Sequence, residues 1–312
     1  MNTPREPSWL IVNADDYGYF GGVSRGILEA AERGIVTATG VFANAERFDD
    51  DVPALRESTA LDAGVHLNLT DGRPLSADMR ACLQRWGGRF PGKFAMAAAV
   101  TMGSVPARAV EAEWRAQIER CLAAGLALQF LNSHEHIHMH PRLFGVATRL
   151  ARAYGIAHLR YTTATLRLAR GAGALARSAV VDALALACRR RLDRPVARFL
   201  GLECSGRVGR ADLDTLTAVL QPGAVYELMC HPGRLDRAEV TDARLLGYHR
   251  WDAELGALTD PSVRALLHER GIRLARYRDL HVDGTRLVPR PAAPGAVSPA
   301  AADGTRGRSP DA

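Results

Sequence analysis

The chain is organised around Leu131-Asn132-Ser133-His134-Glu135-His136-Ile137-His138-Met139-His140-Pro141, where four of its ten histidines stand at every second position. The preceding run, residues 126–131, is short and apolar, as expected of a buried strand. Because side chains alternate across a strand, a continued strand would aim all four imidazoles to one side. Imidazoles at the C-terminal end of a buried strand suit a divalent metal site. A solvated histidine tract is the alternative, but the position after a buried strand favours the metal site.

Strand-like and helix-like patterns alternate on both sides of this stretch. Such alternation predicts right-handed βαβ units around a mainly parallel sheet, in an α/β fold. Residues 71–103 are predicted to be a loop-rich region, and residues 167–194 one or two packed helices that end in a solvated Arg189-Arg190-Arg191 cluster. A membrane-surface helix is the alternative for that segment. Strands are expected at 9–12, 37–42, 63–70, 156–161, 196–202, 224–230 and 274–277, and helices at 23–33, 106–124, 143–154, 213–220 and 262–271.

The composition is that of an ordinary globular protein, with 47% apolar and 24% charged residues among 312. The formal net charge is +6, and Lys93 is the only lysine. The arginines are spread along the chain and no nucleic-acid-binding signature accompanies them, so we expect no nucleic-acid partner. From residue 289 the chain offers little to bury. We therefore expect one domain over residues 1–284 and a disordered Pro/Ala/Gly-rich tail over 285–312.

Cysteine usage and hydropathy indicate where the protein works. The five cysteines are scattered, odd in number and without a CxxC pair, which is typical of a reducing compartment. The N-terminal apolar run, residues 9–12, is too short for a signal peptide, and no run approaches the roughly 18 apolar residues of a membrane span. The sequence therefore predicts a cytoplasmic protein without a transmembrane segment.

Four expected strand ends carry groups that can bind metal or transfer protons. They are Asp15-Asp16, His66, the cluster that starts at His134, and His231. Taken alone, each has a plain structural interpretation: Asp15-Asp16 as a helix cap, His66 as a core histidine and His231 as part of a turn. In parallel α/β barrels, however, functional residues gather at the C-terminal ends of the strands. The shared placement of all four favours a single site.

The same residues carry a resemblance to a known family. The segments are NADDYG at 13–18, GVHLNLT at 64–70, NSHEHIHM at 132–139 and ELMCHPG at 227–233. In this order they resemble the four signature blocks of the YdjC-like carbohydrate deacetylases, which include chitooligosaccharide and hopanoid-associated deacetylases. The resemblance implies a single distorted TIM-like (β/α) barrel. It also implies hydrolysis of an N-acetyl group from an N-acetylglucosamine-containing oligosaccharide or glycolipid.

The resemblance also implies roles for individual residues. Asp15 would be the general base, and His231 is a candidate general acid. Adjacent side chains diverge in an extended chain, which is consistent with one aspartate acting as ligand and the other as base. One divalent metal ion, Mg²⁺ or Zn²⁺, would be held by Asp16, His66 and His134.

Other residues near the histidine stretch remain open in role. His136 and His138 could replace His134 as ligands or contact substrate, and Arg160, at another strand end, is a candidate substrate contact. The family usually has Asp where this chain has Asn132 and often His where it has Glu135, so metal affinity or identity could differ. The alternatives are another metal hydrolase of amides or phosphoesters on the same barrel, and a non-catalytic sugar-binding relative. Peripheral contact with a glycolipid and a homodimer are also open.

Overall fold

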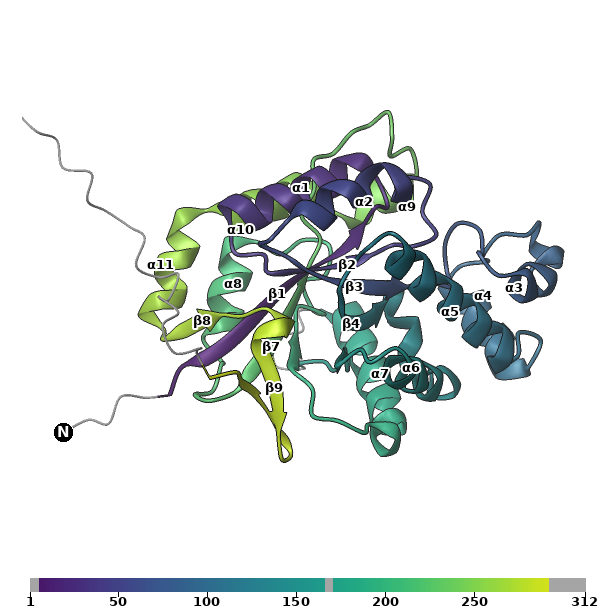
Figure 1. The fold of residues 1–312 in the computed structure, drawn as a ribbon. Coiled ribbons are helices and arrows are strands. Elements are labelled where there is room, and N and C mark those ends of the chain that lie inside the picture. Colours follow the sequence, from purple (N-terminus) through teal and green to yellow (C-terminus); the bar gives the residue numbers. More distant parts are fainter. Residues whose placement is uncertain (1–5, 166–170, 292–312) are drawn as a thin grey trace, which may run out of the picture.

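The computed structural model describes residues 6–165 and 171–291, and its centre is one curled sheet with helices around its outer face (Figure 1). Within these residues the strand order is β5-β4-β3-β2-β1-β7-β6, every pair is parallel, and β8 pairs with the start of β1. No ladder joins β5 to β6 in the described part of the chain. The expected distorted barrel of parallel strands is therefore confirmed, as an incompletely closed half-barrel. The strands are β1 (Ser8–Tyr17), β2 (Ala38–Val41), β3 (Asp62–Leu67), β4 (Leu128–Ser133), β5 (His158–Leu159), β6 (Arg198–Leu200), β7 (Val225–Cys230) and β8 (Ile272–Leu274).

The helices cover the outer face, and most follow the expected amphipathic segments. Several were not predicted: α2, α9 and α10 were missed, and α3 and α4 fall in the region expected to be loop. The six residues of α3 are too few for a periodic signal, and α4 is apolar at almost every position, which hides its periodicity. The helices are α1 (Gly21–Arg33), α2 (Phe48–Glu57), α3 (Ala77–Cys82), α4 (Lys93–Met102), α5 (Ala107–Ala123), α6 (Pro141–Ala153), α7 (Ala172–Cys188), α8 (Arg210–Thr217), α9 (Ala243–Tyr248), α10 (Trp251–Thr259) and α11 (Pro261–Glu269).

The inner face of the sheet is apolar at the end where the strands begin. Ile11, Phe130 and Val225 pack there in one cluster with Tyr277, whose ring stacks on Phe130 at 4.3 Å between centroids. Gly64 leaves room for Phe130, because a Cβ at Gly64 would lie 2.5–2.6 Å from Phe130 atoms. This apolar plug closes one end of the half-barrel, so the polar inner side chains are confined to the other end.

The C-terminal part of the described chain forms a hairpin, β9 (Leu280–Asp283) with β10 (Arg286–Pro289). The expected boundary after residue 284 is wrong, because it separates two strands that pair with each other. Leu280 and Leu287 of the hairpin join the apolar plug, which explains why the segment is ordered. The rest of the expected tail, residues 292–312, lies outside the described residues, as do residues 166–170 before α7.

The histidine stretch does not continue β4. The strand ends at Ser133, and residues His134–Met139 form a short 3₁₀ segment, η2, interrupted by left-handed backbone at Glu135 (φ 51°) and His136 (φ 57°). The Ser133 hydroxyl accepts from the backbone N–H of His138 at 3.0 Å and so turns the chain back on itself. The expectation that all four imidazoles share one strand face is therefore wrong.

Candidate active site

Two neighbouring carboxylates stand at the end of β1. The pairing of β1 with β2 shifts between Ala14 and Tyr17, and Asp16 has a left-handed backbone (φ 75°). This irregularity lets both carboxylates approach one imidazole: Asp15 Oδ1 lies 3.8 Å from His66 Nδ1, and Asp16 Oδ1 lies 3.1 Å from His66 Nε2. Positive φ is rare for residues other than glycine and clusters at functional sites. The bulge thus gives the two aspartates different surroundings.

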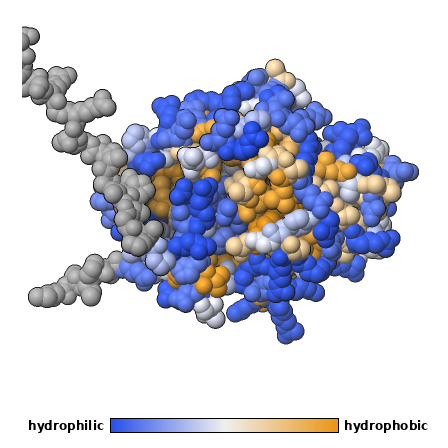
Figure 2. All heavy atoms as spheres, in the orientation of Figure 1, coloured by the Kyte–Doolittle hydropathy of each residue, from blue (hydrophilic) through white to orange (hydrophobic). Residues whose placement is uncertain are grey.

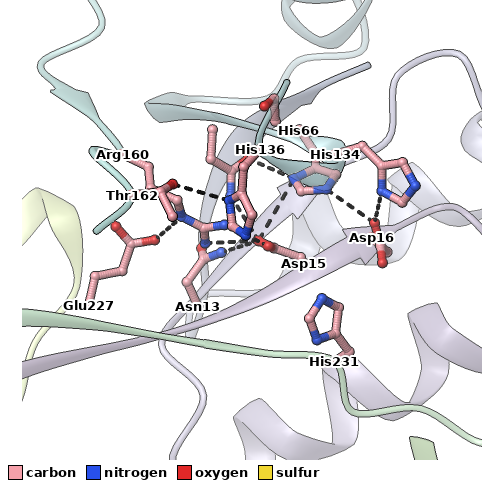
Figure 3. A network of polar contacts seen from close by, with 12 residues as sticks. Asn13, Asp15, Asp16, His66, His134, His136, Arg160, Thr162, Glu227 and His231 are labelled. Carbon is pink, nitrogen blue, oxygen red and sulfur yellow. Dashed lines mark hydrogen bonds and ion pairs between the residues drawn. The ribbon is translucent and has the colours of Figure 1, made fainter. Parts of the chain in front are cut away.

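Asp16, His66 and His134 converge from three segments that are far apart in the sequence (Figure 3). Asp16 Oδ1 is 3.1 Å from His66 Nε2 and 3.0 Å from His134 Nδ1. One donor atom from each residue lies within 4.8 Å of the others. A carboxylate with two imidazoles is a common ligand set for a divalent transition metal that keeps positions open for water or substrate. The residues that the resemblance implied as ligands thus form a group that fits one such ion.

His66 is held in one orientation by Asn132, where the resemblance implied that Asp is usual. Asn132 Oδ1 lies 2.8 Å from His66 Nδ1 and can only accept, so Nδ1 carries the proton and Nε2 faces Asp16. A Cβ at Gly40 would lie 2.9 Å from Asn132 Oδ1 and 3.1 Å from His66 Nδ1, so glycine is needed beside this pair. An amide therefore supplies the orienting acceptor that a carboxylate would otherwise provide.

The charges of the metal-competent group stabilise each other. Burial alone would raise the pKa of Asp16, but His134 and His66 hold it well below its ordinary value. Burial alone would lower the pKa of His134, whereas the adjacent Asp16 carboxylate raises it. The His134 imidazole thus balances the Asp16 charge, which is the role that a bound cation would take over.

Asp15 is the centre of a buried polar layer beneath this group. Its Oδ1 accepts from Asn13 Nδ2 at 2.6 Å and from Asn132 Nδ2 at 2.8 Å. Arg160 donates to both carboxylate oxygens, at 2.6 Å and 3.0 Å. Burial raises the pKa of Asp15, but Arg160 and then His66 outweigh it, so the net pKa is lowered. The carboxylate is therefore ionised and fixed in place.

Arg160 lies beneath Asp15 and does not reach a surface where substrate could bind. Its side chain is 0% exposed and its Nε donates to Glu227 at 2.6 Å. Its guanidinium also stands 5.2 Å above the Phe199 ring. The expected substrate contact is thus replaced by a buried Asp15–Arg160–Glu227 chain of charges, which spacing along the sequence does not reveal.

The other histidines of the stretch have separate environments. His138 is buried, with Nδ1 2.5 Å from Ser133 Oγ and Nε2 2.9 Å from the Arg160 carbonyl oxygen, so its expected roles as ligand or substrate contact are wrong. Burial lowers its pKa to about 3. His136 is only partly buried, and its Nδ1 lies 3.1 Å from Thr162 Oγ1. His136 therefore remains a candidate substrate contact.

Glu135, where the resemblance implied that histidine is common, is not part of the ligand group. It pairs with Lys93, the only lysine of the chain, at 3.0 Å. Lys93 is the first residue of α4, so the ion pair joins that helix to η2. Glu135 thus secures the loop that presents His134.

His231 follows β7 and faces Asp15 and Asp16 from the side opposite His66 and His134 (Figure 3). Its backbone N–H donates to Glu254 Oε2 at 2.7 Å, and its ring Nδ1 is buried without a partner among the described residues. Burial lowers the pKa of His231, so the ring is neutral at rest. A neutral imidazole with an unpaired nitrogen is suited to transfer a proton.

A second histidine beside His231 was missed by the sequence analysis. The ring of His249 lies 5.0 Å from that of His231 and stacks on Trp251 at 4.7 Å. Its Nδ1 is also buried without a partner in the described part of the chain, and burial lowers its pKa to about 3. His249 lies in no motif, so only the packing of α10 against the barrel places it at the site.

Comparison with known proteins identifies relatives over most of the chain. The chain is 31% identical to a carbohydrate deacetylase of Geobacillus stearothermophilus over 88% of its length and 99% of that protein. It is 34% identical to a chitooligosaccharide deacetylase of Klebsiella pneumoniae over 87% of its length and 98% of that protein. A solved structure from Enterococcus faecalis, described as a candidate cellobiose-phosphate cleavage protein, aligns with a TM-score of 0.66 at 28% identity, over 87% of this chain and 98% of that one.

The model of one protein family spans the barrel and the whole site. It matches residues 9–269, from the first strand through α11, and so includes all four segments quoted from the sequence. This chain belongs to the YdjC-like protein family.

Proposed function

We propose that the protein is a metal-dependent carbohydrate N-deacetylase. Its substrate would be an N-acetylglucosamine-containing oligosaccharide or glycolipid. The observation that carries the proposal is the convergence of Asp16, His66 and His134 next to an arginine-bound Asp15. The deacetylase names of the two relatives that are matched over nearly their whole length support the same chemistry.

Asp16, His66 and His134 would hold one divalent ion, and the two imidazoles favour zinc or a similar transition metal over magnesium. Such an ion, when bound, lowers the pKa of water and polarises an amide carbonyl. Asp15 would accept the proton of the attacking water as general base. Arg160 keeps that carboxylate charged and fixed, so its basic oxygen is oriented before substrate arrives.

His231, which is neutral at rest, would take up a proton from solvent in the substrate complex and donate it to the amine nitrogen as the carbon–nitrogen bond breaks. An amine anion is a very poor leaving group, so a proton donor at the nitrogen is required. His231 stands across the site from the metal-competent histidines, which is where the leaving group would lie (Figure 3). Glu254 fixes the backbone of His231 through its N–H, and thereby the direction of the ring.

The decisive test is acetate release by metal-loaded protein from diacetylchitobiose and from an N-acetylglucosaminyl lipid. Asp15→Asn should retain the metal and lower kcat by about a hundred- to a thousandfold, because the base is lost. A variant with unchanged kcat would refute the role of Asp15. Absence of acetate from every substrate, with bound metal confirmed, would refute the deacetylase itself.

The description of the Enterococcus faecalis relative motivates one further substrate class. A cellobiose phosphate belongs in the same assay, with phosphate and free sugar measured beside acetate. Phosphoester hydrolysis commonly uses two metals about 3.5–4 Å apart. Among the described residues only one group of three ligands comes together, which favours a single ion and deacetylation.

A cytoplasmic location is part of the same proposal. All five cysteines are free thiols, in keeping with a reducing compartment. In residues 6–165 and 171–291, none of the helices has both the length and the apolar character needed to cross a bilayer.

A further inference from the structure

Helix α7 is apolar on the side that faces solvent. Its only charged residues, Arg177 and Asp182, both turn inward: Arg177 donates to the carbonyl oxygen of Leu202, and Asp182 accepts from the N–H of Ala164. The outer face therefore consists of small and aliphatic side chains. Val180 is 60% and Leu186 is 70% exposed. A helix that is apolar all round is normally buried on every side, so this face indicates a missing partner.

Helix α4 repeats this arrangement. Its only charged residue, Lys93, pairs with Glu135 of η2, while Phe94 and Met102 are 83% and 74% exposed. The helix is held against the loops of the site by Thr101, whose hydroxyl lies 2.9 Å from His140 Nε2. On α4, therefore, the polar side chains of Lys93 and Thr101 contact the protein, while the large apolar side chains of Phe94 and Met102 face solvent.

The two helices border the same part of the site. Both pack against η2, the segment that presents His134. Figure 1 places α4, α6 and α7 on one side of the molecule, and tan spheres reach the surface around α4 in Figure 2. We define the rim surface as Phe94 and Met102 of α4 with Leu175, Val180 and Leu186 of α7. A partner on this surface would lie beside η2, the segment that presents His134.

Charge identifies the kind of partner. Directly after α7, Arg189, Arg190 and Arg191 form an exposed basic cluster. Apolar side chains next to clustered arginines match an interfacial helix on an anionic membrane, with the apolar face among the acyl chains and the arginines at the headgroups. If the partner were a second copy of the chain, its own three arginines would lie at the same interface, and the like charges would repel each other.

We propose that the rim surface and Arg189–Arg191 dock the protein on an anionic lipid bilayer, so that the site opens toward the membrane surface. This inference goes beyond deacetylation and deepens its substrate class, because a docked enzyme would act on a sugar carried by a lipid. Docking itself does not require that the proposed reaction be correct, and it is measured without turnover.

The test is co-sedimentation of the full chain with vesicles of phosphatidylcholine and phosphatidylglycerol at 3:1, compared with phosphatidylcholine alone. Wild type should pellet with the anionic vesicles and be released by salt. Val180→Glu/Leu186→Glu should lower partitioning at least about tenfold, because two charges enter the apolar face. Arg189→Gln/Arg190→Gln should weaken it about fivefold per arginine.

Val219→Glu/Val282→Glu is the matched control, since these valines are 46% and 50% exposed on other elements. It should bind vesicles as wild type does. Acetate release from diacetylchitobiose should be unchanged in all three variants, which confirms folding, whereas release from a vesicle-borne glycolipid should fall only in the rim and arginine variants. If no substrate is deacetylated, thermal melting replaces the folding control and the vesicle result stands.

Three outcomes would overturn docking on a bilayer. Wild type that stays in the supernatant with anionic vesicles is one, and equal pelleting of Val180→Glu/Leu186→Glu is another. The third is a wild-type dimer, detected by light scattering, that the same double substitution converts to monomer while vesicle binding is absent. That result would assign the rim surface to a second copy of the chain.

Discussion

The polar layer carried by the strands and the histidines carried by the loops differ in how their hydrogen bonds are satisfied. In the strand layer, Asp15, Arg160 and Glu227 are buried and bonded to one another. In the loop region, the Nδ1 atoms of His231 and His249 are buried without partners among the described residues. Buried polar atoms without partners are costly and rare, so each needs an explanation. The difference separates a strand layer whose hydrogen bonds hold Asp15 and its partners in place from histidines whose ring nitrogens are left free to take up a proton.

The same comparison distinguishes the two adjacent aspartates. Asp15 belongs to the strand layer, where both oxygens accept from Arg160. The Asp16 carboxylate pairs instead with the imidazoles of His66 and His134, which can themselves bind a metal. Neighbours in sequence thus receive different chemical roles from their surroundings.

The largest effect is expected for Asp16→Asn, which removes the only charged ligand of the metal-competent group. Metal content should fall and acetate release should drop at least about a thousandfold, since the ion and its activated water are lost together. Elemental analysis and an acetate assay measure the two quantities. Asp242→Asn, in an exposed cap of α9, should change neither. Full metal content in Asp16→Asn would show that another group binds the ion.

Arg160→Met tests whether the strand layer depends on its buried cation. The substitution leaves the carboxylates of Asp15 and Glu227 buried without their counter-charge, so the free energy of unfolding should fall by about 3–5 kcal/mol. Urea denaturation measures this change. Arg149→Met removes an exposed ion pair with Glu111 and should cost less than about 1 kcal/mol. If both variants lost the same free energy of unfolding, the buried ion pairs of the strand layer would be no more important for stability than an exposed ion pair.

Glu254→Gln tests the support beneath His231. Burial raises the pKa of Glu254 to about 8, from an ordinary value of 4.5. Between these values the folded carboxyl keeps its proton while the unfolded one has lost it, so the stability of the wild type falls as pH rises through the window. The glutamine side chain can still accept from the His231 N–H but does not titrate. The variant should therefore gain about a few kcal/mol of stability relative to wild type between about pH 5 and pH 8. Urea denaturation of both proteins across this pH range measures the difference. A difference in the free energy of unfolding that does not change with pH would contradict this expectation.

The smallest effect is expected for Asn132→Asp, which introduces the residue that the resemblance implied at this position. The amide that donates to Asp15 Oδ1 at 2.8 Å becomes a carboxylate oxygen, and two like charges then share one site. The orienting acceptor for His66 is kept, so metal content should stay constant while kcat/KM falls about tenfold. A steady-state assay with elemental analysis measures both, and a higher kcat/KM would indicate that Asn132 limits the wild type.

Much of the fold could be predicted from local pattern. Apolar runs of strand length alternated with amphipathic helices, and most of the expected segments correspond to observed strands and helices. Helices without a clear periodicity were missed, as in α4, where nearly every residue is apolar. The hairpin β9–β10 was not predicted. One reason is that its place in the apolar plug depends on distant residues such as Phe130.

The metal-competent residues were predictable for a different reason. The pattern placed Asp15-Asp16, His66 and the cluster from His134 at or just after strand ends, and parallel strands bring their C-terminal ends together. The choice of Asp16, His66 and His134 among these residues came from the resemblance to the family. The roles of Arg160 and His138 were not predictable, because they depend on burial and on partners from other elements.

The sequence by itself determined the alternation of strands and helices, because this follows from local periodicity, and it placed aspartates and histidines at the strand ends, because the ends of the strands can be located from the same pattern. Only the tertiary structure decided which histidine of the stretch faces Asp16, since the left-handed turn at Glu135 and His136 overrides strand alternation. It also decided that Arg160 supports Asp15 across 145 positions of sequence, because a buried charge is stabilised by whatever opposite charge the fold places beside it.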